Sequence, residues 1–125
     1  MKVISTDKAP AAIGPYSQGI IANGMLYASG QIPIIPETGE LETGDIKKQA
    51  HQAIKNAGEI LKAAGVDYTK VVKTTCFLAN MEDFAEFNSV YEQYFVGKPA
   101  RSCVAVKTLP KNVLCEVEVI AVIGE

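Results

Sequence analysis

A single apolar face runs through residues 43–64 and constrains the fold more than any other stretch of the chain. Apolar side chains recur there at steps of three and four residues, the spacing that places them along one side of an α-helix. Gly65 follows, a residue type that commonly ends helices in the left-handed conformation. A helix with one apolar side must bury it, so the rest of the chain has to supply a partner surface. The apolar positions are Ile46, Ala50, Ala53, Ile54, Ala57, Ile60, Leu61 and Ala64.

A second helix is predicted from Asn80 to about Phe95. Asn80 is a favourable N-cap residue, and the negative charges of Glu82 and Asp83 suit the N-terminal end of a helix dipole. The segment Gly97-Lys98-Pro99 ends this helix. Its buried stripe is aromatic, at Phe84, Phe87, Tyr91 and Phe95.

The first part of the chain is predicted to contain three short strands. Lys2–Ser5 is the first, and Ser17–Ala22 and Met25–Ser29 flank the dipeptide Asn23-Gly24. Asn-Gly supplies the positive φ angles of a type I′ turn, so these two strands are predicted to form a hairpin. Residues 30–44 contain several prolines and glycines and are predicted to form an ordered loop.

Three further β-rich runs follow in the second half of the chain. Val71–Ala79 is dense in β-branched and apolar residues and is predicted to be a central strand. Arg101–Lys107 and Val113–Val122 flank a loop that holds Pro110 and Asn112. These last two runs are therefore predicted to form a β-hairpin with a long connection.

The predicted order of elements is β-ββ-α-β-α-ββ over one domain, residues 1–125. Two one-sided helices and a mixed sheet predict an α+β fold with both helices on one face of the sheet. No element remains to cover the other face. We therefore predict an oligomer whose sheets pack against each other.

Composition argues against several classes of function. The net charge is −2, from 12 basic and 14 acidic residues, and no basic cluster favours a surface for nucleic acid. Cys76, Cys103 and Cys115 lack C-x-x-C spacing, and His51 is the single histidine, so we expect reduced thiols and no zinc site. Neither a membrane span nor a secretory signal is expected. We therefore expect a cytoplasmic protein that binds a small ligand.

Two charged residues interrupt the β-rich runs near the end of the chain, namely Arg101 and Glu116. A charge in a strand that is otherwise suited to burial is costly unless it is paired or used. Arg101 can hold a carboxylate through two parallel hydrogen bonds, and a partly desolvated Glu116 can activate a water molecule. From the residues alone, the simpler interpretations are a structural ion pair or a surface strand position for Arg101, and solvent exposure for Glu116. A bulge or a neighbouring subunit could bring the two together.

Several other residues are candidates for lining a pocket. Cys103 lies two residues from Arg101, hence on the same face, beside a positive charge that favours a thiolate. Tyr16 could offer a ring and a hydroxyl to a ligand, and Ser29-Gly30 ends a strand where the backbone can be approached closely. Asn88 flanks the aromatic stripe, where an inward amide must be hydrogen bonded. Surface packing of Tyr16 and a structural role for Asn88 are the alternatives.

Taken together, these stretches resemble the RidA (YjgF-like) family of reactive-intermediate deaminases over essentially the whole chain. The stretches are G-P-Y-S-Q-G at 14–19, S-G-Q-I-P at 29–33, T-G-E at 38–40, Q-A-x-Q-A-I-x-N at 49–56 and P-A-R-S-C-V-x-V…L-P-K…E-V-E at 99–118. The last of them is the signature region of the family.

The resemblance implies a homotrimer of chorismate-mutase-like fold, with a central barrel of sheets, helices outside and three clefts between subunits. It implies hydrolysis of 2-aminoacrylate and 2-aminocrotonate, or of the imines 2-iminopropanoate and 2-iminobutanoate, to 2-oxo acids and ammonia without a metal or cofactor. Arg101 would hold the substrate carboxylate and Glu116 would position the attacking water. The pocket would be lined by Tyr16, Ser29, Gly30, Asn88 and Cys103.

Three other functions stay open. A regulatory module could hold 2-oxo acids in the Arg101 cleft without turnover. Some relatives are described as translation-inhibiting ribonucleases, although the acidic balance and the lack of a histidine pair argue against that activity here. A chaperone-like trimer is the third.

Overall fold

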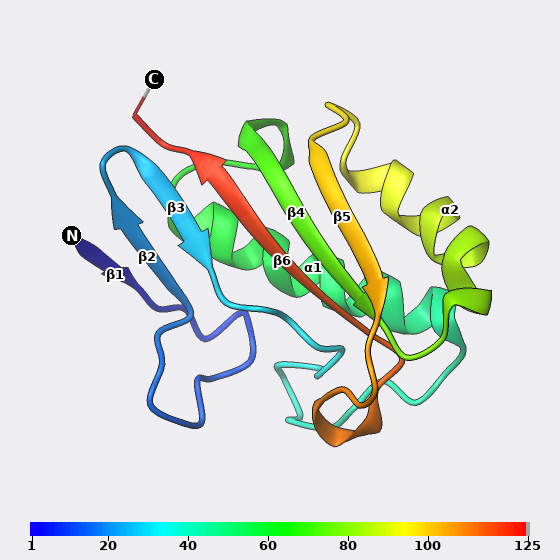
Figure 1. Cartoon of the computed structure of the whole chain (residues 1–125). Helices are drawn as coiled ribbons and strands as arrows, with labels where there is room; N and C mark the ends of the chain where they lie inside the picture. The colour runs from blue at the N-terminus through cyan, green and yellow to red at the C-terminus, as the bar shows by residue number, and fades with distance from the viewer. Residues whose placement is uncertain (125) are drawn as a thin grey trace.

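The computed structural model describes residues 1–124, in which six strands form one sheet accompanied by two α-helices (Figure 1). The helices are α1 (Ile46–Ala63) and α2 (Phe84–Tyr94). Single 3-10 turns are η1 (Tyr68–Lys70), η2 (Met81–Asp83) and η3 (Pro110–Asn112). The strands are β1 (Lys2–Ile4), β2 (Gly19–Ala22), β3 (Met25–Ala28), β4 (Val71–Leu78), β5 (Ala100–Ala105) and β6 (Cys115–Val122).

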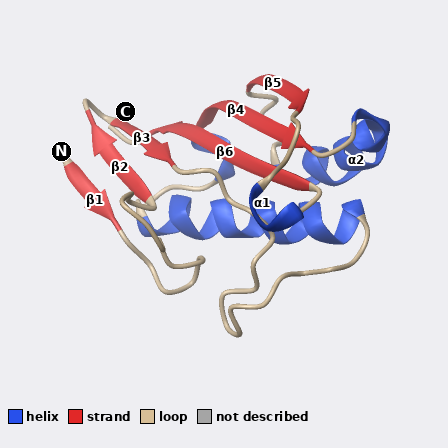
Figure 2. Ribbon diagram, turned by 60° about the horizontal axis from the view of Figure 1, so that its bottom comes forward, coloured by secondary structure: helices blue, strands red, loops and turns tan. Residues whose placement is uncertain are grey.

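Both α-helices cover the same face of the sheet, and within residues 1–124 no α-helix covers the opposite face (Figure 2). The apolar side of α1 is buried against the sheet, as its periodicity predicts, with Ala50, Ala53, Ile54, Ala57, Ile60 and Leu61 fully enclosed. The sheet contributes Leu26, Cys76, Leu78 and Val117 to the same core. The predicted α+β arrangement, with both helices on one face of the sheet, is confirmed. Strands of this sheet also carry exposed apolar side chains, such as Val3, Tyr27 and Val104.

The ends of the helices follow from local chemistry. Helix α1 begins at Ile46, later than the sequence pattern suggests, because Asp45 caps it by accepting a hydrogen bond from the Lys48 amide at 3.0 Å. Gly65 has a φ of +86°, which confirms its predicted left-handed role after the helix. Asn80 makes no side-chain cap. Its carbonyl instead accepts from the Asp83 amide, so a 3-10 turn precedes α2.

The sheet order is β1-β2-β3-β6-β4-β5, and it overturns the hairpin predicted for the last two strands. Strand β5 pairs in parallel with β4, whereas β6 pairs antiparallel with both β3 and β4. Strand β4 therefore lies between β5 and β6 (Figure 1). The physical reason is the crossover through α2, which brings the chain back beside β4 in the same direction and leaves β4's other edge for β6.

The predicted hairpin at Asn23-Gly24 is confirmed. The φ angles of these residues are 52° and 72°, and Ala22 pairs with Met25 across the turn. Residues 30–44 form a loop, as predicted, in which single bridges join Gln31 to Val117 and Ile34 to Leu41. Neither α1 nor α2 combines the length and the apolar character needed to cross a membrane.

Candidate active site

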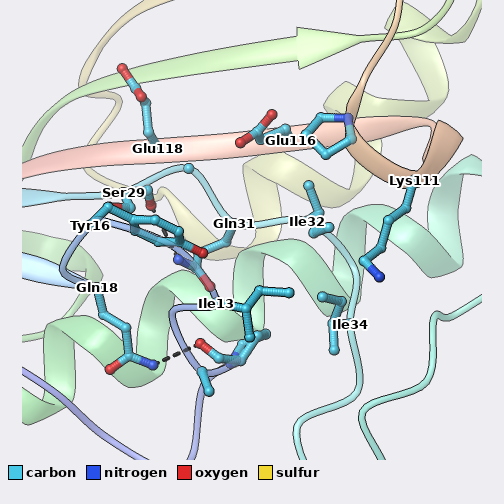
Figure 3. A pocket seen from close by; sticks show the side chains of 14 residues that line it. Ile13, Tyr16, Gln18, Ser29, Gln31, Ile32, Ile34, Lys111, Glu116 and Glu118 are labelled. Carbon is cyan, nitrogen blue, oxygen red and sulfur yellow. Dashed lines mark hydrogen bonds between the residues drawn. The ribbon is translucent and has the colours of Figure 1, made fainter.

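Glu116 lies at one edge of a cleft of about 510 Å³ on the face of the sheet opposite the helices. In β6 the buried side chains Cys115, Val117 and Val119 point toward the helices, so the intervening Glu116 and Glu118 project from the other face. Figure 3 shows both carboxylates on the same side of β6, with the cleft wall below them in the view. Residues that line the cleft include Ile13, Tyr16, Ser29, Gly30, Ile32, Ile34 and Lys111.

Gly30 is packed directly against the Glu116 carboxylate. A Cβ atom built on Gly30 would lie 2.9 Å from the Cδ atom of Glu116, closer than real side chains tolerate. The contact is held by Gln31, whose amide donates to the Val117 carbonyl at 2.8 Å while the Val117 amide donates back to the Gln31 carbonyl at 3.0 Å. The absence of a side chain at Gly30 therefore sets where the carboxylate can sit.

The pKa of Glu116 is raised above its usual value, first by burial and then by the neighbouring charge of Glu118. A carboxylate with a raised pKa is a stronger base once it is ionised. Within residues 1–124 no hydrogen bond is made by its side chain, so the oxygens are available to a ligand or a water molecule.

Ser29 and Tyr16 form the neighbouring wall of the cleft. The Ser29 hydroxyl donates to the Ser17 carbonyl at 2.6 Å, which joins the end of β3 to the loop that carries Tyr16. Tyr16 is 52% exposed, and both residues line this cleft; their role in binding a ligand stays a prediction.

Gln18 is a cleft residue that the sequence interpretation missed. It is 4% exposed, and its side chain donates to the Pro10 and Thr6 carbonyls at 2.8 and 3.0 Å while accepting from the Thr6 amide. These bonds fix the loop that carries Pro10 against the cleft. Its place in the stretch G-P-Y-S-Q-G, next to Tyr16, could have indicated that Gln18 lies near the pocket.

Arg101 and Asn88 lie together in a second hollow of about 470 Å³, between β5 and α2. The Arg101 Nη1 donates to the Asn88 Oδ1 at 2.7 Å. The guanidinium carbon lies 4.7 Å from the centre of the Tyr91 ring and 5.4 Å from that of Phe84, which are cation–π distances. Among residues 1–124 no carboxylate forms an ion pair with Arg101, so the structural ion pair considered above is not found.

Cys103 shares the helix-covered face with Arg101, as predicted, and is half-buried. The expected thiolate is not favoured, because burial raises the pKa of Cys103 and outweighs the lowering effect of Arg101. Cys76 and Cys115 are buried in the core as expected, and burial raises the pKa of each to about 12. No group of three or more His, Cys, Asp or Glu side chains within residues 1–124 is arranged to hold a metal ion.

The strand register separates the two charged residues within one chain. Arg101 pairs with Thr74 on β4, and Glu116 pairs with Phe77 on the same strand. Positions three apart on a strand point to opposite faces, so Arg101 and Glu116 project from opposite sides of the sheet. We call the group Tyr16, Ser29, Gly30 and Glu116 the glutamate half-site, and the pair Asn88 and Arg101 the arginine half-site. One chain does not bring them together.

Comparison with known proteins decides the family. The family model described as endoribonuclease L-PSP, which covers YjgF/RidA proteins, matches residues 6–123. The chain belongs to this family. The recognition made from the sequence motifs is thereby confirmed.

Relatives of the RidA family match nearly the whole chain. A Lactococcus lactis protein named as a candidate regulator, AldR, is 57% identical over 97% of this chain and 97% of its own length. The rat 2-iminobutanoate/2-iminopropanoate deaminase is 53% identical over 98% of this chain and 90% of its own. A crystal structure of a candidate endoribonuclease from Thermotoga maritima superposes with a TM-score of 0.97, at 48% identity, covering 100% of this chain and 99% of that one.

Proposed function

We propose that the protein is an imine deaminase that hydrolyses 2-iminobutanoate, 2-iminopropanoate and their enamine tautomers to 2-oxo acids and ammonia. Relatives at about half identity that bear this activity in their names support a hydrolase acting on C=N bonds. The observation that carries the proposal is the chemistry of the two half-sites. One offers a partly desolvated carboxylate in a cleft, and the other offers a cation with no carboxylate partner among the described residues.

The proposal requires that the half-sites meet between copies of the chain. In the described part of the chain, no α-helix covers the sheet face that bears the glutamate half-site. The arginine half-site lies by β5 and α2, beyond β4. A contact between two different surface patches can close into a ring of identical copies. We propose the homotrimer of the chorismate-mutase-like fold, with the bare sheet faces forming a central barrel.

In the proposed complex the substrate carboxylate pairs with Arg101. Its guanidinium can form two parallel hydrogen bonds to a carboxylate, and Asn88 and the Tyr91 ring hold it in place. Pairing also neutralises the substrate's negative charge next to the reacting carbon. Ser29, the Gly30 backbone, Tyr16 and Cys103 line the remaining space in this proposal.

Glu116 then acts on the water molecule. As the water oxygen bonds to the imine carbon, Glu116 accepts a water proton and the C=N electron pair moves to nitrogen. Glu116 returns this proton to nitrogen, which gives a neutral carbinolamine. Glu116 then accepts the proton of the carbinolamine hydroxyl and passes it to the amino nitrogen, so that the C–N bond breaks, ammonia leaves and the hydroxyl oxygen becomes the carbonyl oxygen of the 2-oxo acid. The imine carbon is already electrophilic, so positioning and charge neutralisation supply the catalysis that is required. The proposed setting is the cytoplasm, beside the pyridoxal-phosphate dehydratases that release these intermediates.

A competition assay tests this proposal. A serine or threonine dehydratase generates the enamine, semicarbazide traps the imine, and added protein competes with the trap. We expect wild type to divert the intermediate to 2-oxo acid faster than solvent does, and Arg101→Ala to lose that ability. An unchanged rate with wild-type protein would rule out the deaminase activity.

A non-catalytic regulator is the second candidate, because one relative at 57% identity is named as a candidate regulator. Glu116→Gln separates the two functions. A deaminase variant would lose turnover by about a hundredfold or more while still binding 2-oxobutanoate through Arg101. A pure binding module would show no turnover in either form.

The ribonuclease activity suggested by the family description has less support. His51, the single histidine, is hydrogen bonded through Nδ1 to the Tyr94 hydroxyl at 2.8 Å, between α1 and α2. A salt-sensitive, tight affinity for RNA would favour that function instead.

A further inference from the structure

Asn56 is a buried polar residue of α1 that lies outside both half-sites. It is 1% exposed, and every hydrogen-bonding group of its side chain is used. Its Nδ2 donates to the carbonyls of Ile32 at 3.0 Å and Ile34 at 2.8 Å, and its Oδ1 accepts from the Gln52 Nε2 at 2.9 Å. A buried amide with this many bonds to a loop is costly to disturb.

The carbonyls that Asn56 holds belong to the wall of the cleft. Ile32 and Ile34 both line it, and Gly30, two residues before Ile32, is packed against the Glu116 carboxylate. Strand pairing joins this wall to the sheet at Gln31, through its two hydrogen bonds with Val117, whereas the bridge between Ile34 and Leu41 joins it to a later part of the same loop. The Asn56 side chain therefore supplies the second anchor, one turn of chain further on.

Pro33 makes that second anchor more important. It lies between the two carbonyls that Asn56 binds, and it has no amide hydrogen to offer to a neighbouring strand. The local bond from the Ile34 amide to the Ile32 carbonyl, at 2.8 Å, sets the turn itself but does not tie it to the rest of the fold. The connection to the helix layer is made by Asn56.

We propose that Asn56 is a positioning residue for Glu116, acting through the wall segment 30–34. Its two donated hydrogen bonds hold this segment against α1, while Gln31 holds it against β6, and together they keep the Gly30 backbone at the distance that fixes the Glu116 carboxylate. The inference rests on the proposed deaminase function for its kinetic test. It also predicts a change in backbone protection that does not depend on turnover.

Asn56→Asp tests the proposal in the full-length protein. Aspartate has the same shape and still accepts from Gln52, but an ionised carboxylate cannot donate to the two carbonyls. We expect kcat in the competition assay to fall by about tenfold to a hundredfold, because a small displacement of a catalytic group is that costly. The Kd for 2-oxobutanoate should change by less than about threefold, since Arg101 and not Glu116 holds the carboxylate. Hydrogen exchange at the Gln31 amide should become faster.

Gln52→Glu is the second variant, at a partly exposed position where the fold is less at risk. An ionised glutamate at position 52 can only accept hydrogen bonds, so it no longer donates to the Asn56 Oδ1. The Asn56 amide group should then rotate so that its N–H groups face residue 52 and no longer the carbonyls of the wall. The same changes in kcat and Gln31 exchange should follow, at smaller size. This variant decides the matter if Asn56→Asp does not fold.

Tyr68→Phe is the matched control. It removes another buried hydrogen bond to α1, from the Tyr68 hydroxyl to the Ile54 carbonyl at 2.8 Å, away from the cleft. We expect it to lower the melting temperature while leaving kcat and Gln31 exchange at wild-type values. The proposal is overturned if folded Asn56→Asp or Gln52→Glu protein keeps wild-type kcat and exchange, or if Tyr68→Phe reproduces their losses. If wild-type protein shows no deaminase activity, only the proposed deaminase function is overturned. Hydrogen exchange at the Gln31 amide would still show whether Asn56 positions the wall segment 30–34.

Discussion

Arg101 and Glu116 project from opposite faces of one sheet, with β4 between the strands that carry them. Their side chains cannot act on one small molecule within a single chain. A function that uses both residues therefore requires at least two copies of the chain, each contributing one of the two groups.

Co-assembly of two inactive variants tests this requirement. Arg101→Ala and Glu116→Gln should each be inactive alone. If they are mixed in equal amounts, unfolded and refolded together, about a quarter of the interfaces will join an intact Glu116 to an intact Arg101. We expect about that fraction of wild-type deaminase activity to return. If the two variants are shown to assemble together and the mixture still has no activity, the active site is not shared between chains.

Gly30→Ala should damage catalysis without unfolding the protein. The added methyl group would overlap the Glu116 carboxylate and push it from its position, so we expect kcat to fall by about tenfold to a hundredfold. Gly97→Ala is the matched control, because nothing lies within 4 Å of a Cβ at that position. Circular dichroism should show both variants folded. Equal activity of the two variants would contradict the role assigned to Gly30.

The pH dependence of the reaction should reflect the raised pKa of Glu116. The base must be ionised, so kcat/KM should fall as pH drops through that pKa, at a higher pH than for an ordinary glutamate. Glu118→Gln removes the neighbouring negative charge and should lower the pKa of Glu116. The acid limb of the profile then moves to lower pH. If the acid side of the pH profile does not move in Glu118→Gln, the fall in kcat/KM reflects the titration of a group other than Glu116.

Glu116→Gln should also change the pH dependence of stability. Because the folded state raises this pKa above the ordinary value of 4.5, ionised Glu116 is less favourable in the folded protein than in the unfolded one. The stabilising contribution of the protonated form is complete below the unfolded pKa and is lost as pH rises through the folded pKa. The melting temperature of Glu116→Gln relative to wild type should therefore be higher at neutral pH than at acidic pH. Calorimetry at several pH values measures this, and a pH-independent difference would contradict it.

Gly58→Ala should destabilise the protein, although alanine is favoured over glycine in a helix by about 1 kcal/mol. A Cβ at Gly58 would lie 2.6 Å from the Cζ atom of Tyr68, whose ring is held by its bond to the Ile54 carbonyl. We expect a loss of about 1–3 kcal/mol in the free energy of unfolding, measured with urea. Lys47→Ala, on the exposed side of α1, should change it by less than about 0.5 kcal/mol. A more stable Gly58→Ala protein would show that Tyr68 moves aside freely.

Local features of the fold could be predicted because they depend on neighbours in the chain. The turn at Asn23-Gly24 and the end of α1 at Gly65 follow from backbone conformations that these residues favour. Strand pairing depends on packing between distant segments, which local patterns do not contain. The loop at Pro110 suggested a hairpin, yet the crossover through α2 made β5 a parallel neighbour of β4. The order strand β4, helix α2, strand β5 was the feature of the sequence that indicated this parallel pairing.

Residues of the candidate site could be picked out from the sequence, but their arrangement in space could not. Glu116 and Arg101 stood out because each is a charge in an otherwise apolar strand. Gln18 and Asn56 did not, because a buried amide and an exposed one look the same in a sequence. Only their bonds to loop carbonyls distinguish them.

If the two half-sites meet between copies of the chain, as proposed, their placement on opposite faces of the sheet makes activity depend on protein concentration. A site that is completed by association is governed by mass action, so dilution below the dissociation constant of the assembly would switch off turnover without unfolding any chain. Expression level would then set specific activity as well as the amount of catalyst, and a cell that makes little of this protein would have disproportionately little protection from its substrates.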